Sequence, residues 1–117
     1  MIFTTLLLGA ALIAGVGIVA AFWNDLVSFL KKAVEKVQAL VAGIVYGTKV
    51  FLRKIGEAIK EISRSYSKVG DHWQETVITR EIPASKVPED ILARADAMGY
   101  GQEMDITDEL EMKLESA

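Results

Sequence analysis

Residues 2–23 read IFTTLLLGAALIAGVGIVAAFW and carry no charged side chain. A continuous helix of this length would be about 33 Å long, which is enough to cross a bilayer core of about 30 Å. The stretch lacks the positively charged start of a secretory signal peptide, and no small-residue cleavage site precedes the charged segment that follows. The sequence therefore predicts a retained, single N-terminal transmembrane helix over residues 2–23.

Aromatic and basic side chains at the end of this stretch set its expected orientation. Trp23 suits the headgroup interface, and three lysines follow it with no comparable cluster on the other side. The predicted membrane-interface residues are Trp23, Lys31, Lys32 and Lys36. The positive-inside rule then predicts a single-pass membrane protein whose C-terminal part is cytoplasmic, with the lipid bilayer as its first partner.

Small residues recur at intervals of four along this stretch and again further on. Such spacing lines one face of a helix, on which a second backbone can approach closely, although glycine and alanine are common in membrane helices anyway. The predicted helix-packing residues are Ala10, Ala11, Ala14, Gly15, Gly17, Ala21, Ala39, Gly43 and Gly47. They favour association with a second copy of the chain or with other subunits of a membrane complex.

Residues 25–69 carry apolar side chains at alternating steps of three and four, which is the spacing of a long amphipathic helix. Asn24 and Asp25 are good N-cap residues for its start, and the glycine in Gly47-Thr48 could kink or interrupt it. Up to residue 70 the chain has nine basic and four acidic side chains, a net charge of +5. We expect this helix to pack against neighbouring subunits, a lipid surface or both.

Residues 72–82 read HWQETVITREI and predict a strand or extended arm, because they are rich in β-branched and aromatic residues. No second strand is evident in the chain, so this strand is expected to pair with another chain. The predicted partner-strand residues are Trp73, Val77, Ile78 and Ile82.

Residues 83–117 predict a short acidic tail with two short helices. Proline and early acidic residues mark the first helix start near Pro88, and Thr107 precedes the second. From residue 71 onward four basic and twelve acidic side chains give a net charge of −8. The predicted fold is therefore mainly α: one N-terminal transmembrane helix, a long amphipathic helix, a short extended arm and two short C-terminal helices.

The sequence has no recognisable catalytic, cofactor-binding or metal-binding pattern. Its one histidine, His72, stands beside Asp71 without a visibly placed nucleophile, and there is no cysteine. The acidic pairs lack the spacing of a calcium loop, and no glycine-rich phosphate loop follows a strand. The basic residues are interspersed with acids, which is a poor fit to nucleic acid. We therefore expect no enzyme, no cofactor, no metal and no nucleic-acid partner.

These expectations favour a membrane-anchored structural or assembly protein that packs through its helices and extended arm into a homo-oligomer or a larger membrane complex. A second class stays open, namely a membrane-permeabilising protein of holin-like or toxin-like type, in which residues 37–48 insert when oligomers form. A third is an accessory subunit of a large membrane complex.

Overall fold

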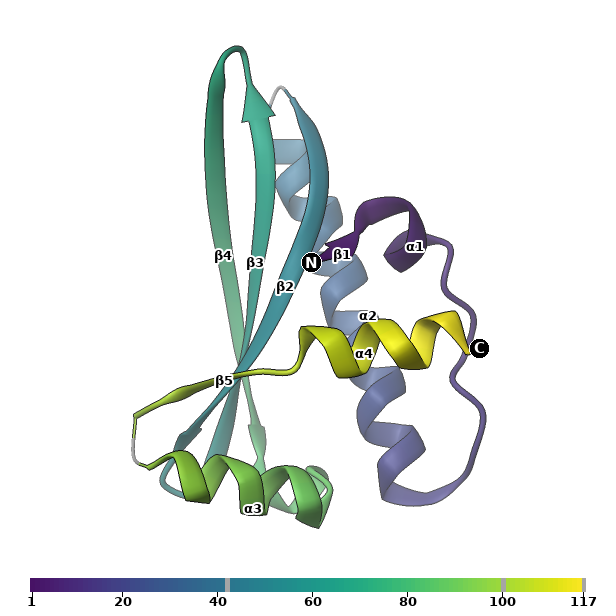
Figure 1. Cartoon of the computed structure of the whole chain (residues 1–117), viewed down its shortest axis with the longest axis vertical. Helices are drawn as coiled ribbons and strands as arrows, with labels where there is room; N and C mark the ends of the chain where they lie inside the picture. Colours follow the sequence, from purple (N-terminus) through teal and green to yellow (C-terminus); the bar gives the residue numbers. More distant parts are fainter. Residues whose placement is uncertain (42, 100, 117) are drawn as a thin grey trace.

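The chain forms an antiparallel sheet of long strands with one long helix along its face (Figure 1). The structure is a computed structural model and describes residues 1–41, 43–99 and 101–116. In chain order the elements are β1 (Ile2–Phe3), α1 (Thr4–Leu8), α2 (Gly17–Leu40), β2 (Ile44–Ile55), β3 (Ala58–Val69), β4 (His72–Pro83), the 3-10 helix η1 (Ala84–Lys86), α3 (Glu89–Met98), β5 (Glu103–Asp105) and α4 (Thr107–Glu115).

The sheet follows the order β1-β2-β3-β4, and β5 also pairs with β2. Two-residue turns, Gly56-Glu57 and Gly70-Asp71, join the three long strands into two consecutive hairpins. Gly56 and Gly70 take φ values of +59° and +61°, which such turns require and which glycine adopts without strain. β2 has partners on both edges, whereas the outer edge of β4 has no strand partner among the described residues.

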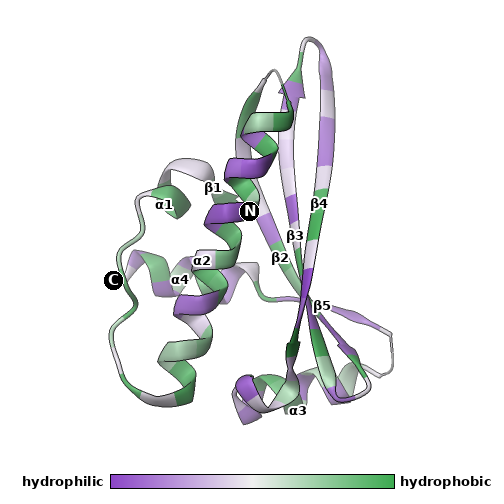
Figure 2. Ribbon diagram, turned by 180° about the vertical axis from the view of Figure 1, so that it is seen from behind, coloured by the Kyte–Doolittle hydropathy of each residue, from purple (hydrophilic) through white to green (hydrophobic). Residues whose placement is uncertain are grey.

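Helix α2 lies over one face of the sheet (Figure 2). Side chains alternate between the two faces of a strand, and those on the helix-covered face are the more buried ones. On β3 the buried side chains of this face are Ile59, Glu61, Ser63, Ser65 and Ser67. The serines are small, so they let the helix approach the strand closely. Four fully buried α2 side chains that fill this layer are Leu26, Leu30, Val34 and Val37. The main core therefore lies between α2 and the sheet, and α4 adds Leu110 and Leu114 to it.

The predicted transmembrane helix over residues 2–23 is wrong. This stretch divides into β1, α1, an irregular segment over residues 9–16 and the first turns of α2. Gly15 takes a φ of +127°, which helical residues do not adopt, and Leu7 and Trp23 are buried in the core. In the part of the chain that the structure describes, no helix is both long and apolar enough to cross a bilayer.

The predictions that depend on this transmembrane helix are also wrong. The single-pass localisation with a cytoplasmic C-terminal part is wrong, and so is a membrane-anchored assembly protein, because both rest on a helix that does not form. The holin-like protein and the membrane-complex subunit were alternatives built on the same anchor. None of the three is retained.

The prediction of a mainly α fold is also wrong. The amphipathic helix expected over residues 25–69, with Asn24 and Asp25 at its N-cap, is replaced by α2, which begins at Gly17 and ends at Leu40. Residues 44–69 form β2 and β3 instead, which pair along their length with an irregularity between Val45 and Gly47. The predicted strand over 72–82 lies in β4, but it does not stand alone, because twelve residues of β4 pair with β3. Helices α3 and α4 lie within the tail where two short helices were expected.

Candidate functional site

The outer edge of β4 presents backbone groups to solvent. In the turn at Gly70-Asp71 the carbonyl of Val69 faces the N–H of His72, so the backbone of His72 is directed at β3. These directions alternate along an antiparallel strand. The residues whose N–H and carbonyl groups point away from β3 are therefore Trp73, Glu75, Val77, Thr79 and Glu81. Pro83 continues this series without an N–H, which is typical of the end of an edge strand.

A groove runs between this edge and helix α2, and we name it the α2–β4 groove. It consists of two hollows of similar size. The upper hollow, of about 320 Å³, is lined by Asp25, Ser28, Phe29, Lys32, Ala33, Lys36, Ile78, Thr79 and Arg80. The lower hollow, of about 350 Å³, is lined by Ile18, Ala21, Phe22, Asp25, Ile82, Ser85 and Lys86. Because Asp25 lines both, the two hollows lie next to each other along the edge of β4.

An ion-pair network on Arg80 includes Asp25, the residue that lines both hollows. The Arg80 guanidinium donates from Nε to Oε1 of Glu61 at 2.5 Å and from Nη2 to Oδ2 of Asp25 at 2.6 Å. It also lies over the ring of Phe29, 4.7 Å from the ring centroid. A single side chain of β4 is thereby bound to β3 and to α2, so this network holds the strand and the helix at a fixed separation.

Glu61 is the buried member of this network. Its side chain is 0% exposed, and its second oxygen, Oε2, has no hydrogen-bond partner among the described residues. Burial raises the pKa of Glu61 above its ordinary value, and the hydrogen bond and positive charge of Arg80 oppose that rise without cancelling it. The carboxyl group is therefore easier to protonate in the folded chain than in the unfolded chain.

This raised pKa predicts a pH dependence of stability. Between the ordinary pKa near 4.5 and the higher folded-state pKa, the folded chain holds a proton that the unfolded chain has released. The contribution of Glu61 to the free energy of unfolding is therefore fully present below the ordinary pKa and is lost as pH rises through the folded-state value. Urea unfolding of the wild type and of Glu61→Gln from about pH 3.5 to 8 measures it. The free energy of unfolding of the wild type minus that of Glu61→Gln should decrease as pH rises across this window. Equal pH dependence of the two proteins would contradict a raised pKa at Glu61.

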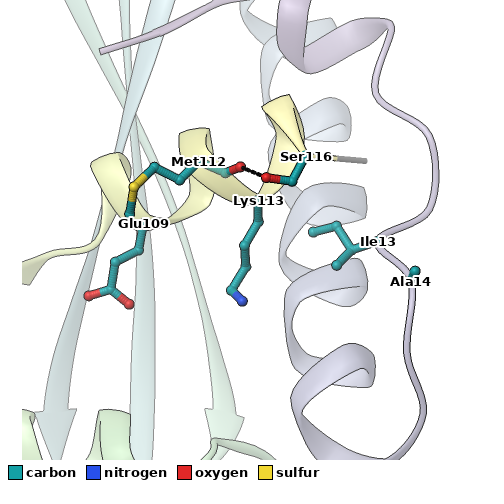
Figure 3. A pocket seen from close by; sticks show the side chains of 6 residues that line it. All are labelled: Ile13, Ala14, Glu109, Met112, Lys113 and Ser116. Atoms are coloured by element: carbon teal, nitrogen blue, oxygen red, sulfur yellow. Dashed lines mark hydrogen bonds between the residues drawn. The ribbon is translucent and has the colours of Figure 1, made fainter.

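A third hollow lies between α4 and the irregular segment over residues 9–16 (Figure 3). Its charged side chains, Glu109 and Lys113, point the same way from α4. Each already has a neighbour: Glu109 pairs with Arg94 of α3, and Lys113 lies 5.1 Å from the ring centroid of Trp23. These contacts tie α4 to α3 and α2, so we assign the charged groups of this hollow a structural role.

Aromatic side chains gather near the Gly70-Asp71 turn, on the face of the sheet turned away from α2. The rings of Tyr46 and Trp73 lie 5.1 Å apart, and the amine of Lys68 lies 6.0 Å from the Trp73 ring. Trp73 is 62% exposed. This cluster connects β2 to β4 where their side chains have no helix over them, and it lies on the opposite face from the α2–β4 groove.

The predicted partner-strand residues separate onto the two faces of β4. Ile78 and Ile82 line the α2–β4 groove, whereas Trp73 and Val77 lie on the open face. Sequence reasoning missed Phe29, Arg80 and Asp25 as groove residues. It also missed Glu61, whose position within a strand alternation was the available signal.

The predicted membrane-interface residues have other surroundings. Trp23 is only 2% exposed, and the amine of Lys31 donates to the carbonyl of Ala10 at 2.8 Å. Lys32 and Lys36 line the upper hollow of the α2–β4 groove. The expected interface is therefore distributed between the core, the 9–16 segment and the groove.

The predicted helix-packing residues do not share a helix face. They lie in the 9–16 segment (Ala10, Ala11, Ala14, Gly15), in α2 (Gly17, Ala21, Ala39), just before β2 (Gly43) and within β2 (Gly47). At Gly47 an added Cβ would lie 2.6 Å from the carbonyl oxygen of Ile2, so glycine there lets β1 pair with β2. At Gly47 the close approach is therefore between the strands β1 and β2 and not between two helices.

Comparison with models of protein families, with curated proteins and with solved structures finds no match for this chain.

Proposed function

We propose that this chain is a protein-interaction module that binds an extended segment of a partner protein as an additional strand on β4. The observation that carries the proposal is the open edge of β4 with the α2–β4 groove beside it. An added strand pairs its backbone with the outward groups of β4, and every second side chain enters the groove. Backbone hydrogen bonds to β4 would provide affinity, and side-chain contacts in the groove would select among partner sequences. The chain then acts by binding rather than by catalysis.

The centre of the edge supports this role. Native edge strands are often protected by charged side chains or by proline, which discourage pairing with another chain. On β4 the charges of Glu75 and Glu81 flank an uncharged run from Val77 to Thr79. Val77 is 45% exposed, so it offers an apolar cross-strand contact to a partner. Pairing is therefore favoured at the centre of the edge and limited at its ends.

The charge of the groove favours a different protein over a second copy of this chain. In a second β4 added with the same face toward the helices, the groove-facing side chains would be His72, Gln74, Thr76, Ile78, Arg80 and Ile82. None of these is acidic, and Arg80 is basic. Self-pairing would therefore bring more positive charge beside Lys32 and Lys36.

Selection of short random peptides on the immobilised full-length chain tests the proposal. The N–H of Thr79 points away from β3, so Thr79→Pro removes a donor that only an added strand would use, while Thr79→Ala keeps it. We expect the selected peptides to bind about tenfold more weakly to Thr79→Pro and with little change to Thr79→Ala. Amide hydrogen exchange should slow at Val77 and Thr79 when peptide is bound.

Urea unfolding of both Thr79 variants provides the control, because the comparison needs folded protein. Binding that is indifferent to Thr79→Pro would place the peptides elsewhere and overturn the proposal. A chain that sediments as a β4-dependent dimer would overturn it in favour of self-pairing.

A further inference from the structure

The two hollows of the α2–β4 groove differ in charge. In the upper hollow, Asp25 and Glu61 already neutralise Arg80, and the described residues provide no ion pair for Lys32 or Lys36. In the lower hollow Asp25 and Lys86 carry opposite charges. The positive charge of the groove is therefore concentrated at its upper end.

Apolar side chains line the same groove at two points. Phe29 of α2 and Ile78 of β4 line the upper hollow, and Phe22 of α2 and Ile82 of β4 line the lower one. Ile78 and Ile82 are four residues apart, which is roughly 14 Å along a strand. Arg80 lies between them, and its guanidinium is engaged by Glu61 and Asp25. An added strand thus meets an apolar site, a polar site and a second apolar site in succession.

The two lysines line the same upper hollow as Phe29 and Ile78, further along α2 from Asp25. From Asp25, which contacts Arg80, helix α2 rises about 10 Å to Lys32 and about 16 Å to Lys36. These rises correspond to about three and five strand residues. β4 runs in the opposite direction to α2, since Ile82 faces the start of the helix and Ile78 faces its middle. Counted from Arg80, these rises reach the level of Val77 and Glu75. The groove-facing positions nearest to the two lysines beyond Ile78 are therefore Thr76 and Gln74.

We infer that the partner segment is an amphipathic acidic strand whose groove-facing residues are, in order, apolar, small polar, apolar, acidic and acidic. This inference rests on the proposed function and names the chemistry of its ligand. Run antiparallel to β4, as all neighbours in this sheet are, the two apolar residues oppose Ile82 and Ile78. The two carboxylates then reach Lys32 and Lys36. The intervening residues face solvent.

Three labelled peptides of matched length test this order by fluorescence anisotropy. The first, ITSTLTETE, follows the inferred order. The second, IESELTTTT, has the same composition with both carboxylates on the solvent-facing side. The third, ITSTLTKTK, replaces the carboxylates with lysines. We expect the first to bind about tenfold more tightly than either of the others.

Charge reversal on the protein provides the complementary arm. Lys32→Glu/Lys36→Glu should reverse the preference, so that the lysine peptide binds more tightly than the acidic one. Lys49→Glu/Lys60→Glu changes the net charge equally on the open face of the sheet and should leave the preference unchanged. Both double variants place their substitutions on exposed or half-buried side chains, so both are expected to fold.

The outcomes separate the inference from the function on which it rests. Suppose that selected peptides bind β4 with the Thr79→Pro signature but carry no groove-facing carboxylates, and that reversal of Lys32 and Lys36 leaves their binding unchanged. The acidic order is then overturned and the strand-addition module stands. Selected peptides without the Thr79→Pro signature would overturn both.

Discussion

Replacing Leu7 by alanine is expected to lower the free energy of unfolding by about 2–5 kcal/mol, because Leu7 is fully buried and the change leaves a cavity. The same substitution at Leu12 is expected to change it by no more than about 0.5 kcal/mol, since Leu12 is 81% exposed. Both residues lie in the uncharged stretch 2–23, so the pair compares one chemical change in two environments.

Urea unfolding followed by circular dichroism measures both variants. In a transmembrane helix the two leucines would lie in the same apolar solvent, and their replacement would have similar effects. The fold makes them unequal because the 9–16 segment crosses the surface while α1 packs inward. Equal effects at Leu7 and Leu12 would contradict this arrangement of the N-terminal stretch.

The N-terminal stretch was misjudged because its composition is compatible with two environments. An uncharged run can enter a bilayer or fill a protein core, and local sequence separates these poorly. The difference depends on contacts made elsewhere: the Asn24 side chain accepts from the N–H of Ile13 at 2.7 Å and donates to its carbonyl at 3.0 Å. Asn24 thereby satisfies backbone groups of a segment that has no helix or sheet of its own.

The hairpin strands were missed because two periodicities coincide over residues 44–69. Apolar side chains there fit steps of three and four, yet Val50, Leu52 and Ile59 also fit strand alternation. The dipeptides Gly56-Glu57 and Gly70-Asp71 are the sequence features that indicate hairpin turns, because each separates two stretches of strand length. By contrast, the strand over 72–82 and the two tail helices were predictable, because their signals are local.

The α2–β4 groove could not be predicted from spacing. Its central contact joins Arg80 to Asp25, which are 55 residues apart, and becomes visible only when the sheet register and the helix position are known. Sequence reasoning did select Ile78, Ile82, Lys32 and Lys36, but assigned the lysines to a lipid interface. Topology brings these four residues to one groove.

The other large effect is expected at Arg80. Arg80→Met keeps much of the aliphatic stem but leaves the buried Glu61 carboxylate without its ion-pair partner, which should lower the free energy of unfolding by about 3–5 kcal/mol at neutral pH. The exposed ion pair of Arg94 with Glu109 provides a matched control. Arg94→Met is expected to cost less than about 1 kcal/mol, because that pair is solvated.

The size of the Arg80 effect should depend on the charge of Glu61, which separates lost pairing from lost packing. Protonation of Glu61 removes the unpaired buried charge, so the destabilisation should shrink as pH falls through the folded-state pKa of that carboxyl. Glu61→Gln in the Arg80→Met background should likewise recover part of the loss at neutral pH. Urea midpoints of the two single variants and the double variant measure this coupling. A loss that is independent of both pH and Glu61 would mean that Arg80 acts through its contact with Phe29 rather than through charge.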